Sequence, residues 1–401
     1  MTYANIILPL PLEGLFTYGV PDALASRVQV GVRVRVPLGK SKTYVGIVAE
    51  YPVALPASDS GVVDNEKKIV YKDILEVLDA TPILLPQQLR LWRWISDYYM
   101  SPIGDVYKAA LPSGLKAEDG YRPRTELYVR LADNFRNERS LTLMIDAMKR
   151  ASKQVEVLMA YLRLAGVDGV EHLTTETPLR EVTREELMND THTTIGVIRA
   201  LSDRKLLVTY EKEVGRLNDN VLPHPEHIKP LNEAQTEAYN QILIQMMGHP
   251  VTLLHGVTSS GKTEIYIHLI QKAIDEHKQV LYLLPEIALT VQITERLKAV
   301  FGNRLGIYHS KYSDAERVEI WQKQLSAQPY DVILGARSAV FLPFQRLGLV
   351  IIDEEHEQSF KQQDPAPRYH ARSAAIVLAQ MYAGAKTLLG TATPSMETYY
   401  N

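Results

Sequence analysis

A glycine-rich loop at residues 256–263 offers the clearest chemistry in the sequence. Its residues are Gly256, Val257, Thr258, Ser259, Ser260, Gly261, Lys262 and Thr263. The loop matches the pattern G-x-x-x-x-G-K-[ST], follows an apolar run and precedes a helical stretch. In such a loop, backbone N–H groups surround phosphates at the positive end of a helix dipole. We therefore predict that the loop binds ATP, with Lys262 at the β- and γ-phosphates and Thr263 among the Mg²⁺ ligands.

An acidic run follows a strongly apolar segment further along the chain. Val350-Ile351-Ile352 precedes Asp353-Glu354-Glu355-His356, and ligands of open α/β sheets bind just beyond the carboxyl ends of the strands. We expect Asp353 to hold Mg²⁺ and Glu354 to polarise the attacking water, since only one of two adjacent carboxylates needs to face the ion. An acidic run alone is usually a solvated turn. The strand before it and the loop upstream favour the catalytic interpretation.

Three further polar residues fit a nucleotide-driven motor. Gln235 lies upstream of the loop. Its amide can donate a hydrogen bond to the edge of adenine and accept one from it. A glutamine in a helix is, however, more often an exposed surface residue. Thr391 and Thr393 belong to Gly390-Thr391-Ala392-Thr393-Pro394. Their hydroxyls can link the nucleotide site to a neighbouring site, and a structural turn explains them nearly as well.

The elements that must position these residues alternate between strands and helices over residues 231–401. Apolar runs at 252–254, 280–284, 332–334, 349–352 and 387–389 are separated by helical stretches. This alternation predicts a buried parallel sheet in an α/β lobe. Residues 215–230, rich in Asn, Pro and His, are interpreted as a linker.

The first 112 residues are predicted to form a small β-rich domain. Residues 31–39 and 43–48 read as antiparallel partners, and 74–78 as a further strand. From Pro86 the period becomes helical, with a buried face formed by Leu89, Leu91, Trp92, Ile95 and Tyr99.

Residues 113–214 are predicted to be mainly helical. Helices at 155–164, 183–188 and 193–206, followed by a strand at 207–211, are compatible with a winged helix or with a small α+β interaction domain. In a winged helix, residues 193–205 form the recognition helix. Its only basic residues are Arg199, Arg204 and Lys205. Binding in the major groove of DNA and docking of a partner are therefore equally open interpretations of this helix.

Composition excludes several classes of protein. The 401 residues are 46% hydrophobic and 23% charged, which is ample apolar material for several cores and rules out general disorder. The absence of cysteine excludes disulfides, thiol catalysis and Cys-ligated zinc within these residues. With a net charge of −3, nucleic acid must be contacted through local patches. We find neither a signal peptide nor a membrane-spanning run, and we expect a cytoplasmic location.

The acidic run and the segment at 390–394 together resemble the helicase core of superfamily 2. The runs at 284–290, 353–363 and 367–372 are similar to one family within it, the bacterial replication-restart DNA helicases (PriA, primosomal protein N′). The resemblance covers essentially the whole chain. It implies a multidomain protein with a 3′-DNA-end-binding domain (1–112), a winged-helix domain (113–214) and a first RecA-like lobe (231–401).

The same resemblance implies further parts beyond Asn401, namely a second helicase lobe and a zinc-binding region. We therefore expect the chain to be a fragment that binds ATP·Mg²⁺ weakly and hydrolyses it negligibly. Zinc is expected only in the missing C-terminal part.

Residue roles follow from the resemblance. A loop after the acidic run contacts single-stranded DNA through Phe360, Lys361, Arg368 and Tyr369, and Arg337 lies on the DNA track. His356 joins Thr391 and Thr393 in coupling DNA binding to hydrolysis.

A pocket for the 3′ end of DNA is implied at Phe16, Tyr18, Gly39 and Lys72. Thr17 stands where the family often has Asp, which puts tight 3′-end selectivity in question. From the residues alone, Phe16 and Tyr18 are interpreted as strand core.

The implied activity is that of an ATP-dependent 3′→5′ DNA helicase that recognises stalled or abandoned replication forks and initiates restart by primosome assembly. The implied partners are branched DNA with 3′ ends of nascent strands, single-stranded DNA, single-stranded-DNA-binding protein and other primosome proteins, with no membrane. Two alternatives stay open. One is a nucleotide-switched, fork-binding assembly platform, and the other is a different superfamily 2 translocase.

Overall fold

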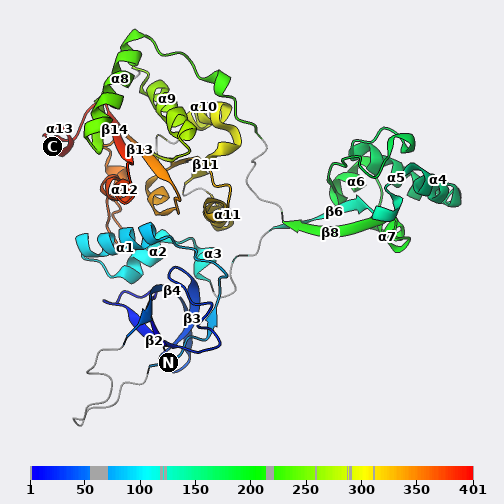
Figure 1. Cartoon of the computed structure of the whole chain (residues 1–401), viewed down its shortest axis with the longest axis horizontal. Helices are drawn as coiled ribbons and strands as arrows, with labels where there is room; N and C mark the ends of the chain where they lie inside the picture. The colour runs from blue at the N-terminus through cyan, green and yellow to red at the C-terminus, as the bar shows by residue number, and fades with distance from the viewer. Residues whose placement is uncertain are drawn as a thin grey trace. The chain divides into compact units, whose positions relative to one another are not determined.

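The computed structural model describes residues 2–54, 71–117, 121, 124–213, 221–257, 260–286, 288, 291–309 and 312–400. The chain divides into two compact units, the first containing residues 1–121 and 217–401 and the second residues 122–216 (Figure 1). Within the described residues, no helix combines the length and the apolar character that a bilayer crossing requires.

Six parallel strands form the centre of the first unit, in the order β11-β12-β10-β13-β14-β9. They are β9 (Val251–His255), β10 (Gln279–Leu283), β11 (Leu305–Tyr308), β12 (Val332–Gly335), β13 (Leu347–Asp353) and β14 (Lys386–Thr391). The five apolar runs expected from the sequence all form strands, which confirms the parallel sheet. The edge strand β11 was not predicted, because a run as short as Leu-Gly-Ile-Tyr carries little periodicity.

Helices cover both faces of this sheet (Figure 1). On one face, α8 (Glu233–Gly248), α9 (Lys262–Asp275) and α10 (Val291–Phe301) pack against alternate strand residues such as Tyr282 and Ile351. On the other, α11 (Asp314–Leu325) and α12 (Ala371–Gln380) pack against the intervening residues, such as Leu283 and Ile352. Burial on both faces explains why the strands are continuous apolar runs.

An antiparallel sheet in the order β2-β1-β4-β3-β5 occupies the N-terminal part of the first unit. Its strands are β1 (Thr2–Ile7), β2 (Phe16–Val20), β3 (Arg33–Leu38), β4 (Lys42–Val53) and β5 (Glu76–Val77). The predicted partners β3 and β4 pair from Arg33–Ile47 to Leu38–Lys42. The strand predicted at 74–78 is shorter than expected, because only the two residues of β5 pair with β3.

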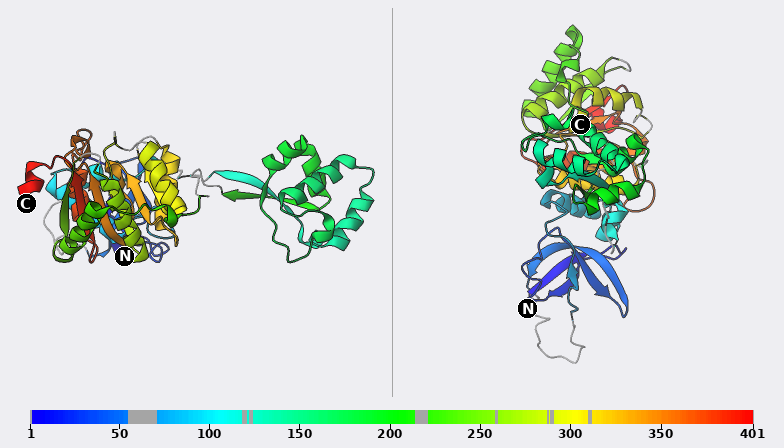
Figure 2. Two further views of the ribbon diagram at one scale, coloured as in Figure 1. Left: turned by 90° about the horizontal axis from the view of Figure 1, so that it is seen from above. Right: turned by 90° about the vertical axis from the view of Figure 1, so that its right-hand side faces the viewer.

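Three N-terminal helices share a hydrophobic core with the lobe. They are α1 (Pro86–Tyr98), α2 (Ile103–Ala110) and α3 (Ser113–Lys116). In Figure 1 and in the right-hand view of Figure 2, α1 and α2 lie between the N-terminal strands and the lobe. The buried Gln88 amide donates to the carbonyl of Phe341 at 2.6 Å, and the Trp321 indole donates to the carbonyl of Ile83 at 2.9 Å.

These contacts join two of the predicted domains in one compact unit, while the predicted domain boundaries stay predictions. Residues 1–112 and 231–401 were expected to be separate domains, yet both belong to the first unit. Residues 113–116 also stay with it, since the Ser113 backbone N–H donates to Asp314 at 2.7 Å. The physical reason is that the second face of the parallel sheet is apolar and the N-terminal helices help to cover it.

Over its described residues, 124–213, the second unit combines the α-helices α4 to α7 with a three-stranded antiparallel sheet in the order β7-β6-β8. Its elements are β6 (Thr125–Leu131), α4 (Glu138–Ala147), α5 (Ser152–Leu164), β7 (Val182–Thr183), α6 (Arg184–Thr191), α7 (Ile195–Asp203) and β8 (Leu207–Glu213). Thr183 caps α6 as predicted, accepting from the Glu186 N–H at 3.0 Å. Helix α7 is shorter than predicted, and Lys205 adopts a left-handed backbone with φ +58°.

We predict that replacing Trp321 by alanine destabilises the N-terminal helices as well as α11. Removing a fully buried Trp costs about 3–5 kcal/mol. The two remaining tryptophans, Trp92 and Trp94, both lie in α1. Their fluorescence during urea unfolding therefore reports on the N-terminal helices, and its midpoint should fall. Leu158→Ala, in α5 of the second unit, serves as the control and should leave that midpoint in place. An unchanged midpoint in Trp321→Ala would contradict the shared core.

Candidate functional site

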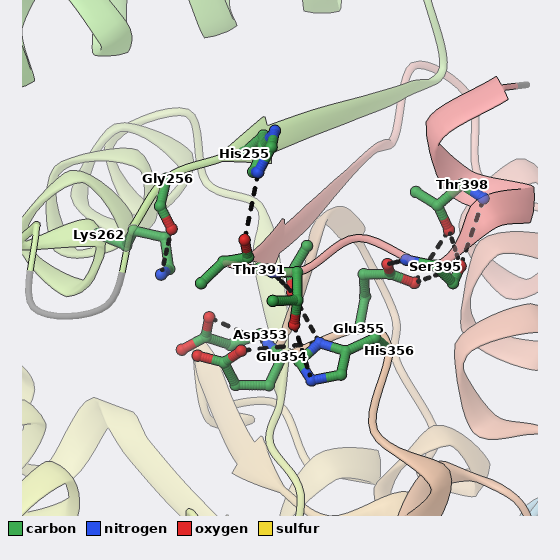
Figure 3. Close-up of polar contacts among 12 residues, drawn as sticks. His255, Gly256, Lys262, Asp353, Glu354, Glu355, His356, Thr391, Ser395 and Thr398 are labelled. Atoms are coloured by element: carbon green, nitrogen blue, oxygen red, sulfur yellow. Dashed lines mark hydrogen bonds and ion pairs between the residues drawn. The ribbon is translucent and has the colours of Figure 1, made fainter.

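Three neighbouring strands bring the predicted nucleotide residues to one edge of the parallel sheet. Asp353, at the end of β13, pairs with Gly390 of β14, and Thr391 pairs with His255 of β9. The Gly256 N–H, at the start of the glycine-rich loop, donates to the Thr391 carbonyl at 3.0 Å. The loop, the acidic run and the 390–394 segment therefore meet at the carboxyl ends of the strands (Figure 3).

The glycine-rich loop leads directly into a helix N-terminus. Helix α9 begins at Lys262, and Gly261 precedes it with φ +80°, a left-handed conformation that glycine adopts without strain. The Lys262 side chain is 8% exposed, and its ammonium donates to the Gly256 carbonyl at 3.0 Å. The half-buried Thr263 lies in the first turn of α9, where a helix leaves backbone N–H groups that can bind an anion. In this turn the Glu264 N–H donates to the Gly261 carbonyl at 2.9 Å. Thr258 and Ser259 lie outside the described residues.

Gln235 lies against the same loop. Its amide nitrogen donates to the Ser260 carbonyl at 3.4 Å, and its amide oxygen accepts from the Asn232 N–H at 3.0 Å. The second bond belongs to a capping box at the start of α8. The side chain is thus held beside the phosphate-binding loop, while its contact with adenine stays a prediction.

Asp353 is oriented by two tyrosines that sequence reasoning missed. The hydroxyl of Tyr266 donates to Oδ1 at 3.0 Å, and that of Tyr282 donates to Oδ2 at 3.3 Å. Tyr266 comes this close because Gly390 has no Cβ, which would collide with the Tyr266 hydroxyl. Burial raises the pKa of Asp353, and the hydrogen bond from Tyr266 partly offsets that effect.

The donor set at this edge suits a magnesium ion. The Asp353 carboxylate and the Thr263 hydroxyl carry oxygen donors, which hard divalent cations prefer, and their binding of Mg²⁺ stays a prediction. The two tyrosine hydroxyls donate hydrogen bonds to the carboxylate of Asp353, as outer-shell partners of metal ligands commonly do. These residues fit the cofactor that the glycine-rich loop implies.

Glu354 has an unusual backbone. Its φ is +49°, in the left-handed region that non-glycine residues rarely occupy, and its backbone N–H donates to Asp353 Oδ1 at 3.2 Å. The side chain is 31% exposed beside the nucleotide edge. Backbone strain of this kind is concentrated at functional positions, which agrees with the predicted role in activating water.

The three predicted coupling residues are in mutual contact. His356 Nδ1 lies 2.7 Å from the Thr391 hydroxyl, and Nε2 lies 3.3 Å from the Thr393 hydroxyl. The structure therefore brings together residues that are 35 and 37 positions apart in the sequence. It joins the acidic run to the segment after β14.

Glu355 forms a buried network that the sequence did not suggest. Its side chain is fully buried and pairs with Arg372 of α12. It also accepts from the Ser395 N–H at 2.8 Å and the Thr398 hydroxyl at 2.9 Å (Figure 3). Burial opposes ionisation, but hydrogen bonds from Ser395, Arg372 and Thr398 outweigh it and lower the pKa of Glu355. The sequence feature that could have indicated this network is Glu355 itself, the second glutamate of the run at residues 353–356.

The loop at 357–370 requires a correction. Phe360 and Tyr369, predicted to contact single-stranded DNA and therefore to offer their rings for stacking on bases, are buried, with 0% and 1% exposure. The Tyr369 ring packs on Phe341 at 5.0 Å between centroids, and its hydroxyl donates to the Arg337 carbonyl at 3.4 Å. Stacking by these two rings is therefore wrong for this arrangement, because both fill the hydrophobic core.

The basic residues in and beside the loop at 357–370 differ in how closely other protein groups hold their side chains. Arg337 donates to the Lys361 carbonyl at 3.1 Å and so anchors the loop. The Lys361 ammonium lies 5.0 Å from the centroid of the Tyr99 ring and donates to the Arg368 carbonyl. Arg368 is 63% exposed and pairs with Asp364 at 3.2 Å. Their contacts with DNA stay predictions.

Three of the four predicted 3′-end residues converge on one turn of the N-terminal sheet. Lys72 donates to the carbonyl of Gly39, whose φ is +67°, and the buried Tyr18 hydroxyl donates to the Pro37 carbonyl at 3.1 Å. Phe16 is half buried and packs against the core of this sheet. Thr17 points to the opposite face of β2, donating to Asn5 Oδ1 at 2.8 Å.

We predict that His370 destabilises the first unit at mildly acidic pH. Burial lowers its pKa to about 4, and the charges of Arg372 and Lys361 add to that effect. The unfolded imidazole, with a pKa near 6.5, binds a proton that the folded one does not. Stability is therefore lost as the pH falls from about 6.5 to 4.

Urea unfolding followed between pH 7 and pH 4.5 measures this loss. His370→Gln should lose less stability over that range than the wild type, whereas the exposed control His249→Gln should behave as the wild type. Equal slopes for wild type and His370→Gln would contradict the prediction.

Three family models match consecutive segments of the chain. Residues 5–112 match the model of the 3′DNA-binding domain of PriA, residues 126–214 the winged helix domain of PriA helicase from Bacteroidota, and residues 232–401 the DEAD/DEAH box helicase family. Among solved structures, RecG bound to a three-way DNA junction is 24% identical over 43% of this chain and 22% of that chain, with a TM-score of 0.32.

Curated relatives match along the whole chain. Replication restart protein PriA of Haemophilus influenzae is 36% identical over 100% of this chain and 50% of the relative. The PriA proteins of Chlamydia trachomatis and Bacillus subtilis are 33% and 31% identical over 100% of this chain, covering 50% and 54% of those relatives. The chain thus spans about half the length of the curated relatives it matches, and over its whole length it is similar to replication restart proteins named PriA.

Proposed function

We propose that the full-length protein is an ATP-dependent 3′→5′ DNA helicase that recognises stalled or abandoned replication forks and starts restart by primosome assembly. The observation that carries this proposal is the meeting of the glycine-rich loop with Asp353 and Glu354 at the carboxyl ends of β9 and β13. The match to PriA proteins supports the restart role.

Each residue of the nucleotide site has a distinct part in the proposed hydrolysis. Lys262 stabilises charge on the phosphates, and Thr263 and Asp353 hold Mg²⁺. The ion supplies charge neutralisation at the phosphate oxygens. Glu354 orients and activates the water that attacks the γ-phosphate in line.

DNA contacts are proposed at two places. Lys361 and Arg368 present positive charge on the loop at 357–370, with Arg337 holding that loop in place. At the N-terminal sheet, Tyr18, Gly39 and Lys72 surround the turn at residues 37–39, where a strand end can approach the backbone of glycine closely.

The partners follow from this function. We propose branched DNA with 3′ ends of nascent strands, single-stranded DNA, single-stranded-DNA-binding protein and other primosome proteins as partners, in the cytoplasm where the chromosome lies. We also propose a zinc site for the full-length protein outside these 401 residues, in keeping with the absence of cysteine among them.

We predict that Lys262→Ala abolishes ATP hydrolysis and unwinding by the full-length protein, because the phosphates lose their charged ligand. ATPase and strand-displacement assays on forked DNA measure both. Lys272→Ala, on the exposed side of the same helix, is the matched control and should retain activity. Retained primosome loading by Lys262→Ala would favour the assembly platform over a motor, and retained hydrolysis would contradict the proposed site.

We predict that Lys72→Ala weakens binding to forks with a 3′-terminal leading strand by about tenfold, the effect of one lost charged hydrogen bond. Affinities are measured for forks that carry a 3′-hydroxyl, a 3′-phosphate or no leading strand. The whole 401-residue chain should be used, because the N-terminal helices share a core with the lobe.

The exposed Lys108, on α2, supplies the control Lys108→Ala. It should bind all three forks as the wild type does. Equal wild-type affinity for the three forks would refute the 3′-end pocket.

A further inference from the structure

We propose that Glu355 and Arg372 form a positioning pair that links the loop at 357–370 to the segment at 391–398 beside the ATP site. The inference rests on the proposed function, because it assumes that DNA binding stimulates ATP hydrolysis. Neither residue is expected to touch DNA or nucleotide. Their part is to hold three chain segments in one arrangement.

The carboxylate of Glu355 is the centre of the arrangement. Its side chain is fully buried, and its partners come from α12 and from the segment after β14. Oε1 accepts from the Ser395 N–H at 2.8 Å, and Oε2 accepts from the Thr398 hydroxyl at 2.9 Å and from Arg372. A buried charge tolerates little displacement of such partners, because each lost contact leaves it without compensation.

Arg372 connects this centre to the loop. It lies in the first turn of α12, which begins at Ala371 as the loop ends. The two arms of the loop are held together, since the Gln362 N–H donates to the Tyr369 carbonyl at 2.9 Å. A displacement of the loop by DNA therefore moves the start of α12 and, with it, the guanidinium.

The guanidinium also reaches the segment after β14 directly. Arg372 Nη1 donates to the Ser395 hydroxyl at 3.0 Å and lies 3.3 Å from the Thr398 hydroxyl. Arg372 and Glu355 thus both hydrogen-bond to Ser395 and Thr398. Figure 3 shows Glu355 with Ser395 and Thr398, next to His356 and Thr391.

On the nucleotide side, Glu355 lies between two residues of the proposed mechanism. Glu354 precedes it with its left-handed backbone, and His356 follows it and bonds to Thr391. The Glu355 N–H donates to the Gly390 carbonyl at 3.2 Å, which fixes the acidic run against β14. A change at Glu355 consequently reaches the backbone of Glu354 through one peptide bond.

The alternative is that the pair only stabilises the fold. Ion pairs of this burial are often no better for stability than apolar residues, so the stability of a variant does not decide its role. The two interpretations differ in one measurable quantity, the ratio of DNA-stimulated to basal ATPase rate. Only a coupling role requires that ratio to fall more than stability explains.

The test uses Glu355→Gln, Arg372→Gln and the double variant in the full-length protein. ATPase rates are measured with and without forked DNA, and thermal unfolding is recorded for each variant. We expect the stimulation ratio to fall about tenfold in each single variant, a typical coupling effect. The double variant should lose no more than either single one, because both remove the same link.

Two further variants keep the test decisive if the ion-pair variants fold poorly. Thr398→Val removes one donor to Glu355, leaves the ion pair intact and should lower the ratio in part. Gln324→Ala removes a buried amide that accepts from Gln279 at the amino end of the sheet, away from the network. It should lower the melting temperature and keep the wild-type ratio.

Three results would overturn the inference. If DNA stimulates the ATPase of the wild type and all Glu355, Arg372 and Thr398 variants keep the wild-type stimulation ratio, the inference is refuted and the proposed function is not. A fall of the ratio in Gln324→Ala that matches its loss of stability would reduce the pair to a structural role. Absence of DNA stimulation in the wild type would overturn the proposed function together with the inference.

Discussion

The structure depends on the order of three parallel strands. Because β14 lies between β13 and β9, the chain must deliver the acidic run, the segment after Gly390 and the glycine-rich loop to the same sheet edge. The register is tight enough to pair Asp353 with Gly390 and Thr391 with His255. Local hydrogen bonds then orient individual side chains, as the Tyr266 and Tyr282 hydroxyls do for the Asp353 carboxylate. Every proposed chemical role at this edge follows from that adjacency.

A second constraint acts on the opposite face of the sheet. That face is apolar, and α11 and α12 share its coverage with the N-terminal helices. The proposed end-binding sheet and the proposed motor are consequently joined through a continuous core instead of a flexible linker. Core packing is close to that of a crystal and transmits strain, so events at the N-terminal sheet have a physical route to the lobe.

Sequence reasoning located residues at the sheet edge where chemistry and periodicity coincide. The positions of Lys262, Thr263, Asp353 and Glu354 were predictable because a loop pattern and an acidic run each follow an apolar strand, while their chemical roles stay predictions. It failed where burial decides the role. Phe360 and Tyr369 look like stacking residues in a polar loop, yet both rings fill the core.

Other features were beyond the reach of sequence reasoning because they depend on tertiary packing. The partner of Glu355 lies 17 positions away at a helix start, and no local spacing announces it. The short β11 carries too little pattern to be recognised, and only its pairing with β12 makes it a strand.

The most direct measurement is a crystal structure of the chain with a non-hydrolysable ATP analogue and Mn²⁺ in place of Mg²⁺, located by its anomalous scattering. The account predicts the metal bound to Asp353 and the Thr263 hydroxyl, with Lys262 turned from the Gly256 carbonyl onto the phosphates. A nucleotide bound elsewhere, or a metal remote from Asp353, would contradict it.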